Sequence, residues 1–161
     1  MIAAVIDEER DPIALFREWR REAAVAPGAP SLPDAMCLST VDPDGTPHAR
    51  FVDLKEVRDD GFVFCTSHAS PKSGHIEANS RVALTFWWDH VGRQVRVAGR
   101  ADRITEAEAD AIFRRRGRDA QLASWAFEQS AGLETYASLE ARLNAARERF
   151  AGGDVPRPPH W

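Results

Sequence analysis

The sequence predicts an α+β protein in which a small antiparallel barrel or curled sheet is flanked by helices. Five segments alternate apolar and polar residues with a period of two, and the turn sequences DPDG (42–45), RDDG (58–61) and DHVG (89–92) divide them. After residue 104 the period becomes helical, and strands followed by helices are typical of this class. A chain of 161 residues has the length of one domain, so we expect a single domain over residues 1–161.

The strands follow one N-terminal helix. That helix is expected over 12–24, because Asp11 is a good N-cap and Pro12 suits the first helical position. A proline-rich connection over 25–34 leads into the sheet. The expected strands are 35–41, 47–57, 61–67, 81–88 and 93–104.

The remaining elements are helical. A short helix is expected within SPKSGHIEAN (70–79), between the third and fourth strands. Thr105 and Glu108 form a capping box at the start of the next helix. The C-terminal helical segments are expected over 105–116, 119–130 and 133–150.

Composition excludes several classes of protein. Apolar residues make up 43% of the chain and charged residues 29%, as in ordinary globular proteins, and the net charge of −4 predicts no general attraction to nucleic acid or anionic membranes. No apolar run approaches the roughly 20 residues of a membrane span. Cys37 and Cys65 are isolated, which favours neither a disulfide framework nor a zinc site. The N-terminus becomes acidic too early for a secretory signal, so we expect a cytoplasmic protein.

The short segment 70–79 carries the sharpest local signal. Ser70 is a good N-cap, Pro71 fits the first helical position, and Lys72 then falls in the first turn, where the helix dipole disfavours a cation. The placement is explained if an anion binds there to backbone N–H groups, the hydroxyl of Ser70 or Ser73, and Lys72. The alternative is a solvated surface lysine.

The scarcity of lysine favours the anion site. The chain has two lysines against nineteen arginines, and they fall at Lys55, inside a strand, and at Lys72. An ammonium is a compact point charge suited to phosphate, and Arg50 can add a bidentate guanidinium. Because Arg50 and Lys55 are five residues apart, a regular strand points them to opposite faces.

Other polar groups leave alternatives open. Gln94 and Arg96 share the strand face opposite two valines, either as ligand contacts or as an exposed polar face. The arginine run 114–118 suits a helix C-terminus, and one of its members could be a ligand. The histidines show no metal-binding spacing, and no Ser/His/Asp motif, Walker loop or GxGxxG is present.

Taken in order, the motifs resemble the FMN-dependent pyridoxine/pyridoxamine 5′-phosphate oxidases. The resemblance runs from DPIALFREW at residue 11 through AMCLSTVDPDGTPHARFVDLK, FVFCTSHASPKSGHIEANSRVALTFWW and RGRDAQLASWAFEQS to VPRPPHW at the end. It implies an FMN-binding split β-barrel with Greek-key-like strands and flanking helices. It also implies a homodimer that holds FMN at the subunit interface.

The resemblance implies a set of FMN-binding residues. They lie on the strand motif from Arg50 to Lys55, on the next strand, at the short helix, on the last strand and in the later helical region. Cys65 stands where the family has a tyrosine, and Pro71 where it has an arginine. The implied residues are Arg50, Phe51, Val52, Lys55, Cys65, Thr66, Ser70, Lys72, Gln94, Gln129 and Ser130.

The substrate side departs from the family pattern. Lys55 and Arg116 keep two of the four phosphate anchors, whereas Ile112 and Ala120 replace a tyrosine and a serine. The family also continues beyond the segment that ends at Trp161, with an Arg-x-His pair near the substrate ring and a Trp and an Arg near FMN. The sequence is therefore either a truncation or a short relative.

The expected function is that of an FMN-dependent oxidase of this type. In the family, a hydride passes from C4′ of a small phosphorylated substrate to flavin N5, and molecular oxygen reoxidises the flavin to give hydrogen peroxide. Two alternatives remain: an FMN-dependent oxidoreductase for another small anionic molecule, for instance in secondary metabolism, and a flavin-binding protein without turnover. No metal, nucleic acid or membrane is expected as a partner.

Overall fold

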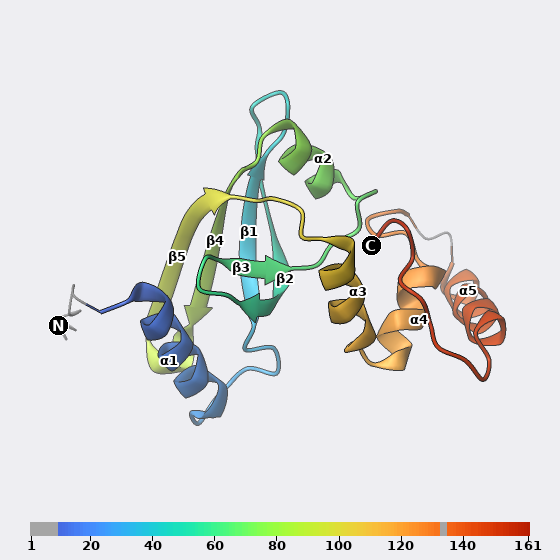
Figure 1. Cartoon of the computed structure of the whole chain (residues 1–161), viewed down its shortest axis with the longest axis horizontal. Coiled ribbons are helices and arrows are strands. Elements are labelled where there is room, and N and C mark those ends of the chain that lie inside the picture. Colours follow the sequence, from blue (N-terminus) through green and yellow to red (C-terminus); the bar gives the residue numbers. More distant parts are fainter. Residues whose placement is uncertain (1–9, 133–134) are drawn as a thin grey trace.

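A curled five-stranded antiparallel sheet forms the centre of the computed structural model, which describes residues 10–132 and 135–161 (Figure 1). The strands are β1 (Ala35–Val41), β2 (Pro47–Val57), β3 (Phe62–Phe64), β4 (Arg81–Trp88) and β5 (Arg93–Arg100). Their order is β3-β2-β1-β4-β5, and its β4-β1-β2-β3 portion is the order of a Greek key. The predicted α+β class, a curled antiparallel sheet with Greek-key-like strands and flanking helices, is confirmed.

Two strands are shorter than predicted. The expected 61–67 strand ends at Phe64, because Thr66 and Ser67 turn away and bond to a distant side chain instead of extending the ladder. The expected 93–104 strand ends at Arg100, after which the backbone N–H of Ala101 bonds to Ser80. In both places the chain leaves the sheet to reach a helix.

The helices lie at the ends and one side of the sheet (Figure 1). They are α1 (Pro12–Val25), α2 (Pro71–Ala78), α3 (Glu106–Arg114), α4 (Arg118–Ala126) and α5 (Tyr136–Arg149), with a single 3-10 turn over Asp89–Val91. Residues 133 and 134 of the last predicted helix, like the N-terminal nine residues, lie outside the described part of the chain. Within that part, no helix is long and apolar enough to cross a membrane.

The predicted starts of α1 and α3 are accurate. The carboxylate of Asp11 accepts hydrogen bonds from two N–H groups of α1, and Thr105 and Glu108 form a complete capping box on α3. The predicted ends fare less well. The 119–130 helix stops at Ala126, because Phe127 adopts an extended conformation, and Gly117 begins α4 instead of ending α3.

The described core consists of two separate clusters. The sheet cluster has Phe16 of α1 at its centre, 4.8 Å from the ring centroids of both Phe62 and Phe86. The helical cluster joins α3, α4 and α5 through residues such as Phe113 and Leu122. Because the two clusters share no residue, the prediction of one domain stays a prediction.

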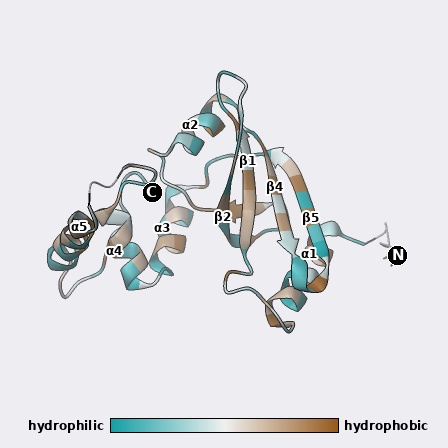
Figure 2. Cartoon of the chain, turned by 180° about the vertical axis from the view of Figure 1, so that it is seen from behind, coloured by the Kyte–Doolittle hydropathy of each residue, from teal (hydrophilic) through white to brown (hydrophobic). Residues whose placement is uncertain are grey.

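The sheet has one inner and one outer face. Along β2 the inner positions include Arg50, Val52 and Leu54, whereas Phe51 is 75% exposed on the outer face. Figure 2 shows apolar and hydrophilic residues alternating along β5 in the same way. Trp87 of β4, at 57% exposure, pairs with Gln94 on this outer face.

Candidate functional site

Lys72 is buried, with 7% of its surface exposed, although it occupies the first turn of α2. Its ammonium donates a hydrogen bond to the side-chain oxygen of Gln129 at 3.1 Å. The hydroxyl of Thr66 donates to the same oxygen at 2.8 Å, and the backbone N–H of Ser67 does so at 3.0 Å. Three donors therefore converge on one oxygen atom at the start of a helix, which is the geometry of an oxyanion site.

The positive charge at this point is concentrated. Burial and the nearby Arg50 guanidinium both lower the pKa of Lys72. Arg50 reaches the site from the inner face of β2, and its Nη1 donates to the hydroxyl of Thr40 at 2.7 Å and to the carbonyl of Leu38 at 3.2 Å. Two neighbouring cations, one of them buried, favour the binding of an anion between them.

Ser70 occupies the predicted N-cap position but does not cap the helix with its side chain. Its hydroxyl donates to the carbonyl of Ser67 at 2.7 Å, and the hydroxyl of Ser73 donates to the same carbonyl at 2.8 Å. The expectation of a Ser70 side-chain cap is therefore wrong. The two hydroxyls fix the turn that presents the Ser67 N–H to the site.

A second group of predicted residues gathers around Cys65. Burial raises the pKa of the Cys65 thiol, and the positive charges of Lys55 and Arg116 oppose that shift. Lys55 lies at a shift of the β2–β3 register between Leu54 and Glu56, and it pairs with Asp53. The ion pair with Asp53 places Lys55 on the same face of β2 as Asp53, opposite the face of Arg50, as the strand period predicts.

Arg116 has a donor to spare. Its Nε is buried and has no hydrogen-bond partner among the described residues. Its Nη2 donates weakly to the carbonyl of Ala120 at 3.4 Å, and its guanidinium lies 5.3 Å from the ring centroid of Trp161. A buried donor without a partner is costly, so this arginine is suited to an anionic ligand. Ile112, one turn earlier, is buried and apolar.

Other predicted residues lie apart from the Lys72 cluster. Gln94 and Phe51 are on the outer face of the sheet, and Val52 packs against the sheet core. No hydrogen bond within residues 10–132 and 135–161 joins Gln94 to that cluster. Gln129 and Ser130 lie beyond the end of α4 at Ala126, although the predicted helix included them, and Ser130 has a positive φ of 72°, an unusual conformation for a residue other than glycine.

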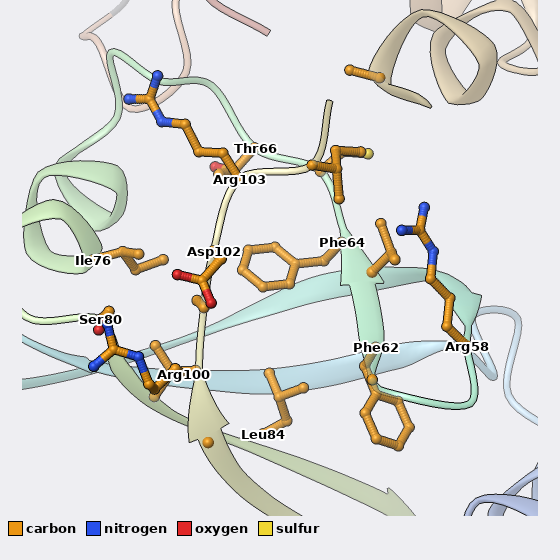
Figure 3. A pocket seen from close by; sticks show the side chains of 18 of the residues that line it. Arg58, Phe62, Phe64, Thr66, Ile76, Ser80, Leu84, Arg100, Asp102 and Arg103 are labelled. Carbon is orange, nitrogen blue, oxygen red and sulfur yellow. The ribbon is translucent and has the colours of Figure 1, made fainter. Parts of the chain in front are cut away.

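A cavity opens beside the site, between β3 and the chain that follows β5. Its volume is about 800 Å³, and Figure 3 shows Phe64, Ile76 and Leu84 reaching towards it, with Arg58 and Arg100 around them. Of the predicted site residues, Cys65 and Thr66 line it. These two residues thus connect the cavity with the polar clusters on either side of them.

Sequence reasoning missed three contributors to the Lys72 cluster. The Ser67 N–H depends on a turn that no local motif predicts. Thr40 is 1% exposed and His75 bonds to it at 3.1 Å, behind Arg50. A detectable signal existed for Thr40, because it continues the inward series of Met36 and Leu38 along β1, where a hydroxyl is exceptional.

The strand order, the helix-end oxyanion site and the flanking helices define a split-barrel protein of the flavin-binding type. Structural comparison agrees: PhzG from Burkholderia lata, solved in complex with tetrahydrophenazine-1-carboxylic acid, superposes with a TM-score of 0.88 at 26% identity over 99% of this chain and 78% of its own. A pyridoxamine 5′-phosphate oxidase-related, FMN-binding protein from Nostoc punctiforme gives a TM-score of 0.63 at 16% identity, covering 91% and 74% of the two chains.

The chain belongs to the pyridoxamine 5′-phosphate oxidase family, whose model matches residues 29–150. The pyridoxine/pyridoxamine 5′-phosphate oxidase of Azorhizobium caulinodans is 48% identical over 151 residues, which are 94% of this chain and 70% of that protein. The protein of the same name from Rubrobacter xylanophilus is 49% identical over 151 residues, 94% of this chain and 69% of its own. The family resemblance seen in the motifs is confirmed.

Proposed function

We propose that the chain binds FMN and uses it to oxidise a small anionic molecule. The observation that carries the proposal is the convergence of Lys72, Thr66 and the Ser67 N–H on a single oxygen of Gln129. Gln129 is exposed, so a phosphate oxygen can replace its amide oxygen without unpacking a core. Arg50, beside Lys72, supplies a second positive charge for a phosphate dianion.

The two groups of cations are assigned to different parts of the ligands. Arg50, Thr66, Ser70 and Lys72 are assigned to the phosphate end of FMN, and Lys55 and Arg116 to the anionic group of the substrate. Cys65 and Thr66 lie between the groups, where the flavin ring would connect them. When bound, the flavin supplies two-electron redox chemistry, and the protein residues position the reactants and exclude water.

The family relatives favour a particular reaction. Relatives that are 48–49% identical bear the name pyridoxine/pyridoxamine 5′-phosphate oxidase, which supports oxidation of a phosphorylated vitamin B6 compound with oxygen as the electron acceptor. Lys55 and Arg116 would then bind the substrate phosphate. Their contribution is limited, because Lys55 already pairs with Asp53.

A specific observation favours a second candidate. Ile112 and Ala120 offer no side-chain hydrogen bond, and the free Nε of Arg116 suits a carboxylate, which needs fewer donors than a phosphate. PhzG, the 26% identical neighbour, was solved with a ring-fused carboxylic acid. The second candidate is therefore an FMN-dependent oxidoreductase for an aromatic carboxylate of secondary metabolism.

We also propose that the chain forms a homodimer through the outer face of the sheet. Phe51 and Trp87 are large, apolar and more than half exposed there, and helices cover the inner side instead. Large apolar side chains that remain exposed together commonly mark an interface. A partner on this face would also bury Gln94, in agreement with an FMN site that lies at the subunit interface.

Three measurements test the proposal in sequence. The purified protein should show a flavin absorption spectrum that survives dialysis, and FMN should restore that spectrum to the stripped protein. Hydrogen peroxide should then form with pyridoxamine 5′-phosphate or with an aromatic carboxylate such as a reduced phenazine carboxylic acid. A protein that binds no flavin contradicts the proposal, and flavin binding without turnover on a broad substrate panel leaves the non-catalytic alternative.

A further inference from the structure

Arg50 is held by one of its two terminal nitrogens. Nη1 uses both of its hydrogens, one on the hydroxyl of Thr40 at 2.7 Å and the other on the carbonyl of Leu38 at 3.2 Å. Nη2 and Nε have no hydrogen-bond partner among the described residues. The guanidinium is therefore fixed on one side and keeps three N–H donors for a ligand.

The direction of the Thr40 hydrogen bonds follows from donor counting. A guanidinium can only donate, so the Thr40 hydroxyl accepts from Arg50. Thr40 is buried, and its own proton needs an acceptor. Within the described residues, that acceptor is Nδ1 of His75, 3.1 Å away. His75 therefore presents an unprotonated Nδ1, and its ring orients the hydroxyl that orients Arg50.

The His75 ring is itself held in place. It lies 4.5 Å from the ring centroid of His48, and Nε2 of His48 lies 2.9 Å from a carboxylate oxygen of Asp42. His75 also stands three residues after Lys72 on α2, so the two side chains share one face of that helix. A single helix thus contributes one direct cation to the site and one indirect contact through Thr40.

This support has a reason in the charges of the site. Arg50 and Lys72 repel each other, as the lowered pKa of Lys72 reflects. Without support, a long arginine side chain would turn away from the buried ammonium, and the anion site would then lose one of its two positive charges. The bonds to Thr40 and Leu38 oppose that movement before any ligand arrives.

We propose that Thr40 and His75 are positioning residues that hold Arg50 ready for the FMN phosphate. The inference rests on the proposed function, since it assigns the ligand of Arg50. It adds two residues to which no contact with the cofactor or the substrate is assigned. Their effect is confined to the phosphate end of the ligand, which separates a positioning role from a general role in folding.

The test compares FMN with riboflavin, which lacks the phosphate. Thr40→Val keeps the shape of the side chain and removes the hydroxyl, so it should raise the Kd of FMN about tenfold or more and leave the Kd of riboflavin unchanged. Thr40→Ser should restore FMN binding to within about threefold of wild type. Thr46→Val is the control for loss of a threonine hydroxyl, because Thr46 is exposed in the turn between β1 and β2.

His75 supplies an independent variant. His75→Leu should raise the Kd of FMN and should add nothing further in a Thr40→Val background, because both changes break the same chain of contacts. His75 is only half-buried, so this variant serves if Thr40→Val does not fold.

Each result has a clear meaning. Unchanged FMN binding in both variants, or an equal loss of FMN and riboflavin, overturns the positioning role. A wild-type protein that binds neither ligand overturns the proposed function itself, and the inference with it.

Discussion

The ammonium of Lys72 and the side-chain oxygen of Gln129 are 3.1 Å apart although 57 residues separate them in the chain. Lys72 belongs to the helix at one end of the sheet, and Gln129 to the segment that follows α4. The contact therefore joins the sheet to the helical region at the proposed phosphate site, where the first prediction can be made.

Lys72→Met should weaken FMN binding about 10- to 100-fold, the effect of about 1.5–3 kcal/mol for a hydrogen bond to a charged group. The thermal midpoint of the ligand-free protein should not fall, because the change removes a buried charge. Fluorescence titration of the stripped protein measures the Kd. Arg81→Gln, at an exposed arginine that begins β4, is the control, and an unchanged Kd for Lys72→Met would falsify the anion site.

The stability of the ligand-free protein should depend on pH through Lys72. Burial and Arg50 lower its pKa from the ordinary value of 10.5, so between the two values the unfolded chain binds more protons than the folded chain. The free energy of unfolding should therefore rise with pH over that interval, relative to Lys72→Met. Urea unfolding of both proteins at pH 7, 9 and 10 checks this, and a constant difference between them contradicts it.

Arg116→Gln should raise KM for the anionic substrate about tenfold or more while leaving the Kd of FMN unchanged. The unpartnered Nε and the influence of Arg116 on the Cys65 thiol support the proposal that this guanidinium binds the substrate. Arg116→Lys should not restore KM, because an ammonium lacks the planar donor fork. Steady-state kinetics distinguish these outcomes, with Arg114→Gln at an exposed neighbouring arginine as the control. A KM that does not move removes Arg116 from the substrate site.

Ala120→Ser should lower KM for a phosphorylated B6 vitamer if that is the substrate, because it returns a hydroxyl beside Arg116. The companion change Ile112→Tyr, which would return the tyrosine of the family pattern, is less informative. Ile112 is 4% exposed, and a larger ring there should destabilise the protein by about 1–3 kcal/mol. If Ala120→Ser instead leaves KM for the vitamer unchanged and raises KM for an aromatic carboxylate, the second candidate function gains support.

Phe51→Asp combined with Trp87→Asp should convert the proposed dimer into a monomer of 17.9 kDa. Both side chains are exposed on the outer face of the sheet, so the charges should disturb assembly without disturbing the fold. Sedimentation velocity measures the mass. Tyr136→Asp changes an equally exposed aromatic residue on α5 and should leave the mass of the dimer intact. A wild-type monomer refutes the assembly.

The sequence predicted the fold well where the signals were local. Asp11, Pro12 and Thr105 act on their own neighbours, and they mark the helix starts correctly. The ends of β3, β5 and α4 were misplaced, because each is decided by a distant contact. The hydroxyl of Thr66 and the backbone N–H of Ser67, for example, donate hydrogen bonds to Gln129 and not to a neighbouring strand.

The site was predictable in part for the same reason. The unusual Lys72 at a helix start indicated an anion site, and the structure brings Thr66, Gln129 and Arg50 to it. The side-chain cap expected from Ser70 was wrong, because its hydroxyl donates to the carbonyl of Ser67, and that contact depends on the shape of the turn. Gln94 lies apart from these residues, on the outer face of the sheet, and its assignment to the cofactor site stays a prediction that depends on the proposed dimer.

The separation of the core into two clusters has a consequence for cooperativity. The sheet and helical clusters are linked by polar contacts, including Arg58–Glu108, Lys72–Gln129 and the backbone bond from His68 to His160. A few polar contacts couple the unfolding of two regions less strongly than a shared apolar core does. The helical region should therefore exchange its amide hydrogens through openings that leave the sheet intact. A phosphate bound at Lys72 would displace Gln129 and loosen that link. If FMN binds there, its binding should loosen the helical region, and hydrogen exchange should then show a loss of protection in α4 and α5.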